Sequence, residues 1–147
     1  MTECQYRQQV DAIIVNSDAK TLVETAQKIA GEMIQTNNWG GVNEGASVST
    51  SQIRNIYGSS KKIEMTLDAN NVADMYNRLV LLKPKMAYAN GRFNKSFRGG
   101  YKIPGFITLV DCLSYAIDKV EGDYTRMKNF FNFFEAILAY HKAEGGK

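Results

Sequence analysis

Basic side chains gather in the middle of this sequence, where they could bind a polyanion. Ten lysines and arginines lie between residues 54 and 102, against three acidic residues. The segment before it has three basic and six acidic residues, and the segment after it has five basic and six acidic residues. In chain order, the net charges of the three segments are therefore −3, +7 and −1. This asymmetry favours a nucleic-acid partner, because cations neutralise phosphates. A solvated, lysine-rich surface would give the same counts, and charge alone leaves both interpretations open.

Aromatic residues are interspersed among these cations. Tyr88, Phe93, Phe97 and Tyr101 could stack on bases while nearby lysines and arginines contact the phosphate backbone. For any one residue, a place in the core or on a solubilising surface is an equally good interpretation. For the cluster as a whole, we favour nucleic-acid binding. The basic residues of the segment are Arg54, Lys61, Lys62, Arg78, Lys83, Lys85, Arg92, Lys95, Arg98 and Lys102.

Residues that could carry out catalysis are sparse. His141 is the one histidine, and a lone histidine inside a helical pattern is more often structural than a general base. The sequence has no zinc-ligand spacing and no phosphate-binding glycine loop of the GxxxxGKS type. We therefore expect a protein that is not an enzyme, with no catalytic residue, no metal and no cofactor. A fold that gathered distant carboxylates into a weak nuclease site is the alternative.

The two cysteines, Cys4 and Cys112, are too few for a disulfide framework. Cys112 lies in an apolar helical pattern and is predicted to be a buried thiol, whereas Cys4 is expected to be loosely held near the start. The sequence begins without the apolar segment of a signal peptide, and no apolar run approaches membrane-spanning length. The expectation is a cytoplasmic protein without a membrane partner.

Helical periodicity predicts the elements that must position the basic residues. Apolar residues recur every three or four positions over residues 18–34, 49–67, 71–90, 106–120 and 123–141. A shorter element over residues 5–15 could be a helix or a strand. The fold class predicted is all-α, a compact bundle of five to six helices, forming a single domain over residues 1–147.

Local signals predict where these helices begin and end. Ser17 or Asp18 should cap one helix, and Ser49 with Gln52 has the form of a capping box. Pro84 should kink a helix or begin a new one at Lys83, and Asn90 followed by glycine should end it. Trp39 is predicted to pack on the body, and the four phenylalanines of the last helix are predicted to lie in the core: Phe130, Phe131, Phe133 and Phe134.

Three blocks of the sequence, in this order and spacing, resemble a known family. They are residues 50–54 (TSQIR), residues 81–92 (LLKPKMAYANGR) and residues 133–142 (FFEAILAYHK). The chain is similar over this region to the small subunit of the type III-A CRISPR effector, the Csm complex. Residues 49–143 would be the family-like core, and residues 1–48 an extension of less certain role.

The resemblance implies a function that composition does not. Small subunits of this family are helical bundles that stack as an inner filament, contact other effector subunits, and support the guide RNA–target RNA duplex through basic contacts that do not read sequence. They do not cut RNA. The matching basic positions are Arg54 in the first block and Lys83, Lys85 and Arg92 in the second; Lys61 and Lys62 are added because they follow on the same predicted helix as Arg54.

Two other functions remain open from the sequence. A helical DNA-binding module would need a recognition helix that presents polar side chains to base edges, and no clear helix-turn-helix is present. A purely structural interaction module would turn the basic residues toward an acidic protein partner. Salt dependence would distinguish polyanion binding from apolar docking.

Overall fold

The computed structural model describes residues 4–34, 39, 48–95 and 104–145, with the side chains of residues 92–95 and 104 left out. Seven helices and no strand lie within these residues, which confirms the all-α prediction. In chain order they are α1 (Arg7–Asn16), α2 (Ala19–Met33), α3 (Thr50–Thr66), α4 (Val72–Val80), α5 (Leu82–Lys95), α6 (Pro104–Val120) and α7 (Tyr124–Ala143).

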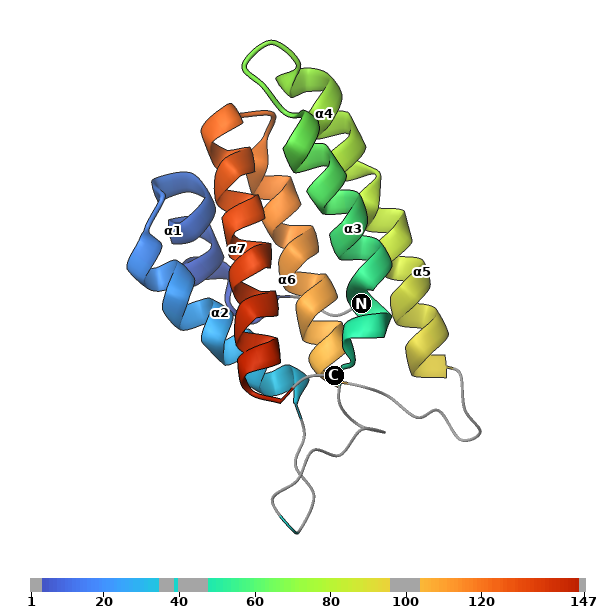
Figure 1. The fold of residues 1–147 in the computed structure, drawn as a ribbon. Coiled ribbons are helices and arrows are strands. Elements are labelled where there is room, and N and C mark those ends of the chain that lie inside the picture. The colour runs from blue at the N-terminus through green and yellow to red at the C-terminus, as the bar shows by residue number, and fades with distance from the viewer. Residues whose placement is uncertain (1–3, 35–38, 40–47, 96–103, 146–147) are drawn as a thin grey trace.

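A central pair of helices is covered on one side by a second pair and on the other side by a group of three helices (Figure 1). α6 and α7 run antiparallel in the centre, because the short turn at Glu121 and Gly122 reverses the chain with positive φ angles of 50° and 72°. α1 and α2 cover one side of this pair. α3, α4 and α5 lie on the other side, where α3 contacts α7 and both α4 and α5 contact α6.

Capping residues define several helix starts, as the sequence predicted. The Asp18 carboxylate accepts a hydrogen bond from the Thr21 N–H at 3.1 Å. At the start of α3 both halves of the capping box are present: the Ser49 hydroxyl accepts from the Gln52 N–H at 3.3 Å, and the Gln52 side chain accepts from the Ser49 N–H at 2.7 Å. These bonds fix the first turns of helices that the periodicity alone could place only approximately.

The segment over residues 71–95 differs in part from expectation. Leu81 separates α4 from α5, so Pro84 lies in the first turn of a new helix, where its missing N–H is tolerated. The predicted stop at Asn90 and Gly91 is wrong, because α5 continues to Lys95. A glycine costs a helix only about 1 kcal/mol. Packing of α5 on α3 and α6 is sufficient to offset it.

Buried aromatic side chains form the centre of the bundle, as predicted. Phe130, Phe131, Phe133 and Phe134 of α7 are each no more than 3% exposed. Tyr57 of α3 packs edge-on against Phe134, with ring centroids 5.2 Å apart. α7 therefore carries apolar contacts on several faces and ties the α1–α2 side of the bundle to α3.

Two predictions about single residues were wrong. The Trp39 side chain is 93% exposed and lies outside the buried core, because the apolar faces of the helices fill that core without it. Cys4 is buried rather than loosely held, since the segment before α1 folds onto α6. Within the described residues, no helix is long and apolar enough to cross a membrane.

Candidate nucleic-acid interface

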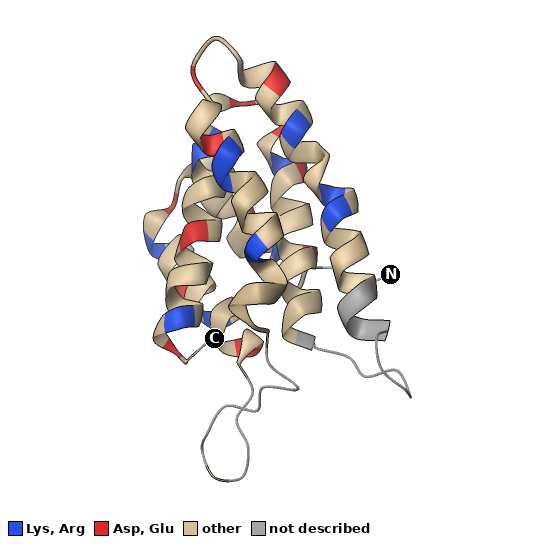
Figure 2. Ribbon diagram, turned by 45° about the vertical axis from the view of Figure 1, so that its right-hand side comes forward, with Lys and Arg blue, Asp and Glu red and all other residues tan. Residues whose placement is uncertain are grey.

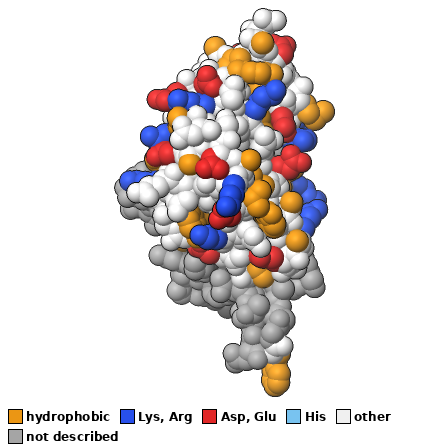
Figure 3. All heavy atoms as spheres, turned by 90° about the vertical axis from the view of Figure 1, so that its left-hand side faces the viewer, with side chains coloured by type: hydrophobic (Ala, Val, Ile, Leu, Met, Phe, Trp, Pro, Cys, Tyr) orange, Lys and Arg blue, Asp and Glu red, His pale blue; other side chains and the backbone are white. Residues whose placement is uncertain are grey.

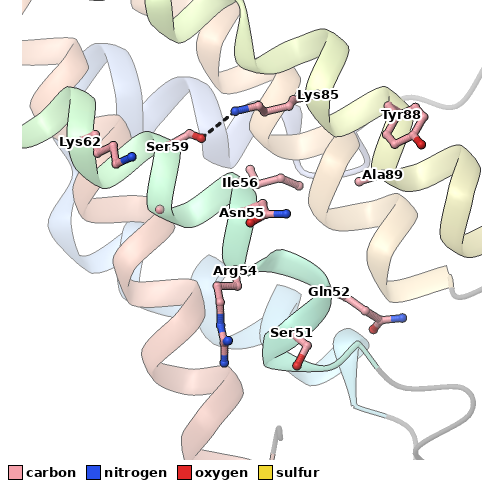
Figure 4. Close-up of a pocket in the computed structure, with 11 residues that line it drawn as sticks. Ser51, Gln52, Arg54, Asn55, Ile56, Ser59, Lys62, Lys85, Tyr88 and Ala89 are labelled. Carbon is pink, nitrogen blue, oxygen red and sulfur yellow. Dashed lines mark hydrogen bonds between the residues drawn. The ribbon is translucent and has the colours of Figure 1, made fainter.

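A groove runs between α3 on one side and α4 and α5 on the other. It consists of two adjoining hollows of about 760 and 680 Å³, which share Ser59, Lys62 and Lys85 as lining residues. Figure 4 shows the first hollow, with side chains of α3 facing those of α5. We call this feature the α3–α5 groove.

The α3 edge of the groove is a polar stripe at helical spacing. The residues on it recur every three or four positions: Ser51, Asn55, Ser59, Lys62 and Thr66. The buried apolar residues of α3 pack on the bundle, and two of them, Ile56 and Ile63, also line the hollows. The amphipathic pattern of α3 thus turns its polar side chains into the groove by burying the rest.

The opposite edge mixes cations with exposed apolar side chains. Tyr88 lines the first hollow, of about 760 Å³, and Arg78 and Leu81 line the second, of about 680 Å³. Lys85 lines both hollows. Tyr88 is 71% exposed, which excludes the core interpretation of this residue and leaves its ring available for stacking.

The charge of the groove is positive. Arg54, Lys62, Arg78 and Lys85 line it, and no acidic residue does so in the part of the chain that the structure describes. Basic positions recur along α3 and along α4 and α5 in Figure 2. Arg78 lies 3.7 Å from Asp74 on its own helix, but both side chains are well exposed, so this pair leaves the charge of Arg78 largely available.

The cations of the groove differ in how they are held. Among the described residues, the Arg54 guanidinium and the Lys62 ammonium have no salt-bridge or hydrogen-bond partner. Lys85 Nζ donates a hydrogen bond to Ser59 Oγ at 2.9 Å across the groove (Figure 4). This contact fixes Lys85 in place without neutralising it, since a hydroxyl carries no charge.

The start of α3, where the groove begins, is anchored from two directions. The Val48 N–H donates to the Met33 carbonyl at the end of α2, at 2.8 Å. The Val48 carbonyl lies 2.6 Å from His141 Nε2 of α7, which is fully buried and donates to it. His141 is therefore structural, as the sequence predicted. It positions the first turn of α3, including Ser51 and Gln52, which line the first hollow of the groove.

Not every basic residue singled out from the sequence lies in the groove. Lys61 Nζ pairs with Glu64 at 3.1 Å, and this hydrogen bond raises the pKa of Lys61 above its ordinary value. Lys83 Nζ pairs with Asp118 at 2.6 Å on another face of α5. The Arg92 position lies on α5, but its side chain is outside the described part of the chain. The structure thus places Lys62 and Lys85 on the two sides of the groove; Arg54 is also a lining residue, but its side chain points away from α5 (Figure 4).

The helical spacing could have identified the remaining lining residues. The stripe from Ser51 to Thr66 follows the same three-and-four pattern that was used to find the apolar face. Arg78 belongs to the second edge because it precedes Leu81, Lys85 and Tyr88 by helical intervals. What the sequence could not supply was the pairing of these two stripes across a groove.

Another face of the molecule has a different electrostatic character. On the side formed around α1 and α2, acidic and basic side chains are interspersed (Figure 3). Lys119 Nζ, for example, lies 3.7 Å from Asp11 there. The α3–α5 groove is therefore distinguished by segregated positive charge rather than by a high density of charge.

The described residues contain no group of three or more His, Cys, Asp or Glu side chains that could hold a metal ion. The groove offers hydroxyls, amides, cations and a tyrosine ring, which are the groups that contact phosphates, sugars and bases. Such an arrangement can bind a nucleic-acid backbone along its length.

Comparison with known protein families gives a match over residues 16–147, described as Csm2 Type III-A. The same chain matches no curated protein and no solved structure. The family match includes α2 and all of the groove-forming helices, and it agrees with the three sequence blocks within residues 50–142. The chain belongs to the Csm2 Type III-A family, the small subunit of the type III-A CRISPR effector complex.

Proposed function

We propose that this subunit supports the guide RNA–target RNA duplex through the α3–α5 groove, by contacts that do not read the base sequence. The observation that carries the proposal is that Arg54, Lys62, Arg78 and Lys85 all line one groove, which no acidic residue lines in the described part of the chain. Flexible cations neutralise phosphates at any base sequence, which suits a subunit that must accept many different guides.

The proposed role is non-catalytic. The groove side chains are hydroxyls, amides, cations and one phenol, without a paired general acid and base. In this proposal the residues bind and hold RNA, and cleavage and signalling belong to other subunits.

Single copies of the protein should bind RNA weakly. Three or four exposed cations supply a small number of phosphate contacts, each worth little in water. We propose that copies stack as a filament inside the complex, so that these contacts act together at a high effective concentration. The free protein is then expected to bind RNA poorly, and the assembled complex to bind it tightly.

The test is purification of the complex from its native host through a tag on this chain, followed by sequencing of the bound RNA. The groove variant carries Arg54→Ala, Lys62→Ala and Lys85→Ala. The control variant carries Lys20→Ala, Lys28→Ala and Lys142→Ala, which removes the same charge from exposed positions on α2 and α7.

We expect guide RNA and the other effector subunits to be recovered with the wild-type chain and with the control variant. The groove variant should assemble but hold target RNA more weakly. Equal retention of target RNA by both variants would place the RNA elsewhere and favour a purely structural role. Recovery of DNA instead of guide RNA would favour the DNA-binding alternative.

A further inference from the structure

The two hollows of the α3–α5 groove differ in their chemistry. Lys62, Arg78 and Lys85 line the second hollow, so its polar groups are mainly cations. The first hollow shares Lys62 and Lys85 with the second, and Arg54, its third cation, points away from α5 (Figure 4). The other polar side chains of the first hollow are neutral: Ser51, Gln52, Asn55, Ser59 and Tyr88. Cations suit phosphates, whereas hydroxyls and amides suit the hydroxyl groups of a sugar.

Several of these neutral groups are available to a ligand. Within the residues that the structure describes, the exposed side chains of Ser51 and Asn55 make no hydrogen bond. The Gln52 side-chain oxygen accepts from the Ser49 N–H at 2.7 Å, which leaves the Gln52 amide nitrogen free to donate. In Figure 4, Gln52 and Asn55 extend from α3 toward the side on which α5 lies. The first hollow therefore presents donors and acceptors that the fold itself does not use.

The α3 wall of the first hollow is shaped for an extended strand. Ser51, Asn55 and Ser59 follow one another at intervals of four residues, which is about 6 Å of helix rise for each step. Gly58 lines the same hollow, and beyond its chain neighbours and the nearby backbone of α3 no atom lies within 4 Å of its Cβ position. A glycine inside a helix costs about 1 kcal/mol. Here the missing side chain leaves room for a sugar–phosphate backbone to approach the helix closely.

We propose that the first hollow is a ribose-recognition site, in which Ser51, Asn55 and the Gln52 amide hydrogen-bond the 2′-hydroxyl groups of the target strand. These contacts select RNA over DNA of the same base sequence. The target strand is the one concerned, because its sugar is the one that differs between the nucleic acids to be told apart. This inference rests on the proposed function, since it requires the duplex to lie in the α3–α5 groove.

The chemistry of the duplex explains why neutral side chains are needed for this selection. Lysines and arginines bind the phosphates of RNA and DNA alike, so the cations of the groove supply affinity without telling the two sugars apart. An A-form RNA duplex displays its 2′-hydroxyls along a wide and shallow minor groove, where each can donate and accept a hydrogen bond. The Ser51 hydroxyl and the Asn55 amide can also do both. A deoxyribose leaves them without a partner.

The experiment measures the affinity of the assembled complex for three target strands of one base sequence, with ribose, 2′-deoxyribose or 2′-fluororibose sugars. The 2′-fluoro strand keeps the A-form shape of the duplex but cannot donate a hydrogen bond, so it separates contact with the hydroxyl from recognition of shape. The ribose variant carries Ser51→Ala and Asn55→Ala. The matched control carries Gln27→Ala and Asn132→Ala, which remove two neutral side chains from exposed positions on α2 and α7.

The ribose variant is expected to fold, because alanine favours a helix at both positions and the capping pair Ser49 and Gln52 is left intact. Circular dichroism checks this, and the comparison of the three strands on the wild-type complex needs no variant.

The wild-type and control complexes should prefer the ribose strand over both analogues. In the ribose variant this preference should fall about tenfold for each engaged copy, as expected for the loss of two neutral hydrogen bonds. Its salt dependence should stay unchanged, since no charge is removed. Differences in base-pairing energy cancel, because every complex is tested with the same strands.

Failure of this inference can be distinguished from failure of the proposed function. The groove variant, which lacks Arg54, Lys62 and Lys85, should bind all three strands more weakly and keep the preference for ribose. If the groove variant binds weakly but the ribose variant keeps the full preference, the inference is overturned and the proposed function stands. Equal binding of the ribose and 2′-fluoro strands by the wild-type complex would also overturn it. If both variants behave as the control does, the proposed function fails as well.

Discussion

At the scale of single residues, four lysines of similar sequence context have different surroundings. Lys62 and Lys85 line the α3–α5 groove, whereas Lys61 is paired with Glu64 and Lys83 with Asp118. The sequence placed all four in one candidate site, because basic residues near each other in the chain look alike. Whether a lysine can contact RNA depends on the face of the helix on which it lies and on whether an acidic side chain already pairs with it.

Lys62→Ala should weaken RNA binding by the assembled complex by about 1 kcal/mol per copy, the size of an exposed charge contact. Lys61→Ala is the matched control, since it removes the neighbouring charge from the same helix but from a residue that Glu64 already pairs. Equilibrium binding of labelled target RNA compares the two. An equal loss of affinity for both variants would mean that the position of Lys62 in the groove gives it no special part in RNA binding.

At the scale of the helices, the sequence was a good guide wherever a local side-chain bond fixes an end. Ser49 and one of Ser17 and Asp18 were expected to be caps, and Ser49 and Asp18 each accept a backbone hydrogen bond in the structure. Asp123 caps α7 in the same way. The end of α5 could not be read in the same way. Asn90 and Gly91 permit a helix stop without requiring one, and packing against α3 and α6 decides the outcome.

The contact between α2 and α6 depends on a missing side chain. A Cβ atom at Gly105 would lie 2.4 Å from the Glu32 carbonyl oxygen and 2.6 Å from the Met33 Cα. Gly105→Ala should therefore force the first turn of α6 away from α2. We expect a loss of about 1–3 kcal/mol in the free energy of unfolding, as for other overpacked sites.

Gly58→Ala provides the control for that loss, because no atom beyond its chain neighbours and the nearby backbone of α3 lies within 4 Å of its Cβ position. This change should stabilise the protein by about 0.5–1 kcal/mol through helix propensity. Urea unfolding of both variants measures the difference. If both substitutions changed the free energy of unfolding in the same direction, the close approach at Gly105 would not be what sets the stability of that contact.

At the scale of the whole molecule, the all-helical class followed from periodicity, but the arrangement of the helices did not. The groove exists because α3 and α4–α5 come together on the side of the α6–α7 pair that α1 and α2 leave uncovered. Contacts such as Lys85 with Ser59, or His141 with the Val48 carbonyl, join positions far apart in the chain. A single sequence contains no periodic signal for such pairings.

Residues 1–147 are proposed to form one folding unit. α1 and α2 pack on α6 and α7, and they bury Ile14, Ile29 and Met33 there. A chain that lacks residues 1–48 should therefore lose cooperative unfolding and expose apolar surface to the dye ANS. A single sharp urea transition for the shortened chain, as steep as expected for its size, would instead show that the C-terminal part folds alone.

The salt dependence of duplex binding tests the central claim most directly. We would measure the affinity of the assembled complex for a guide RNA–target RNA duplex across a series of salt concentrations. The wild-type complex is compared with complexes that carry Arg54→Ala, Lys62→Ala and Lys85→Ala, or the α2 and α7 control changes. Three lost phosphate contacts per copy should reduce the slope of log affinity against log salt by about 2–3 per engaged copy. A slope equal to that of the control complex would contradict the assignment of the α3–α5 groove as the RNA-binding surface.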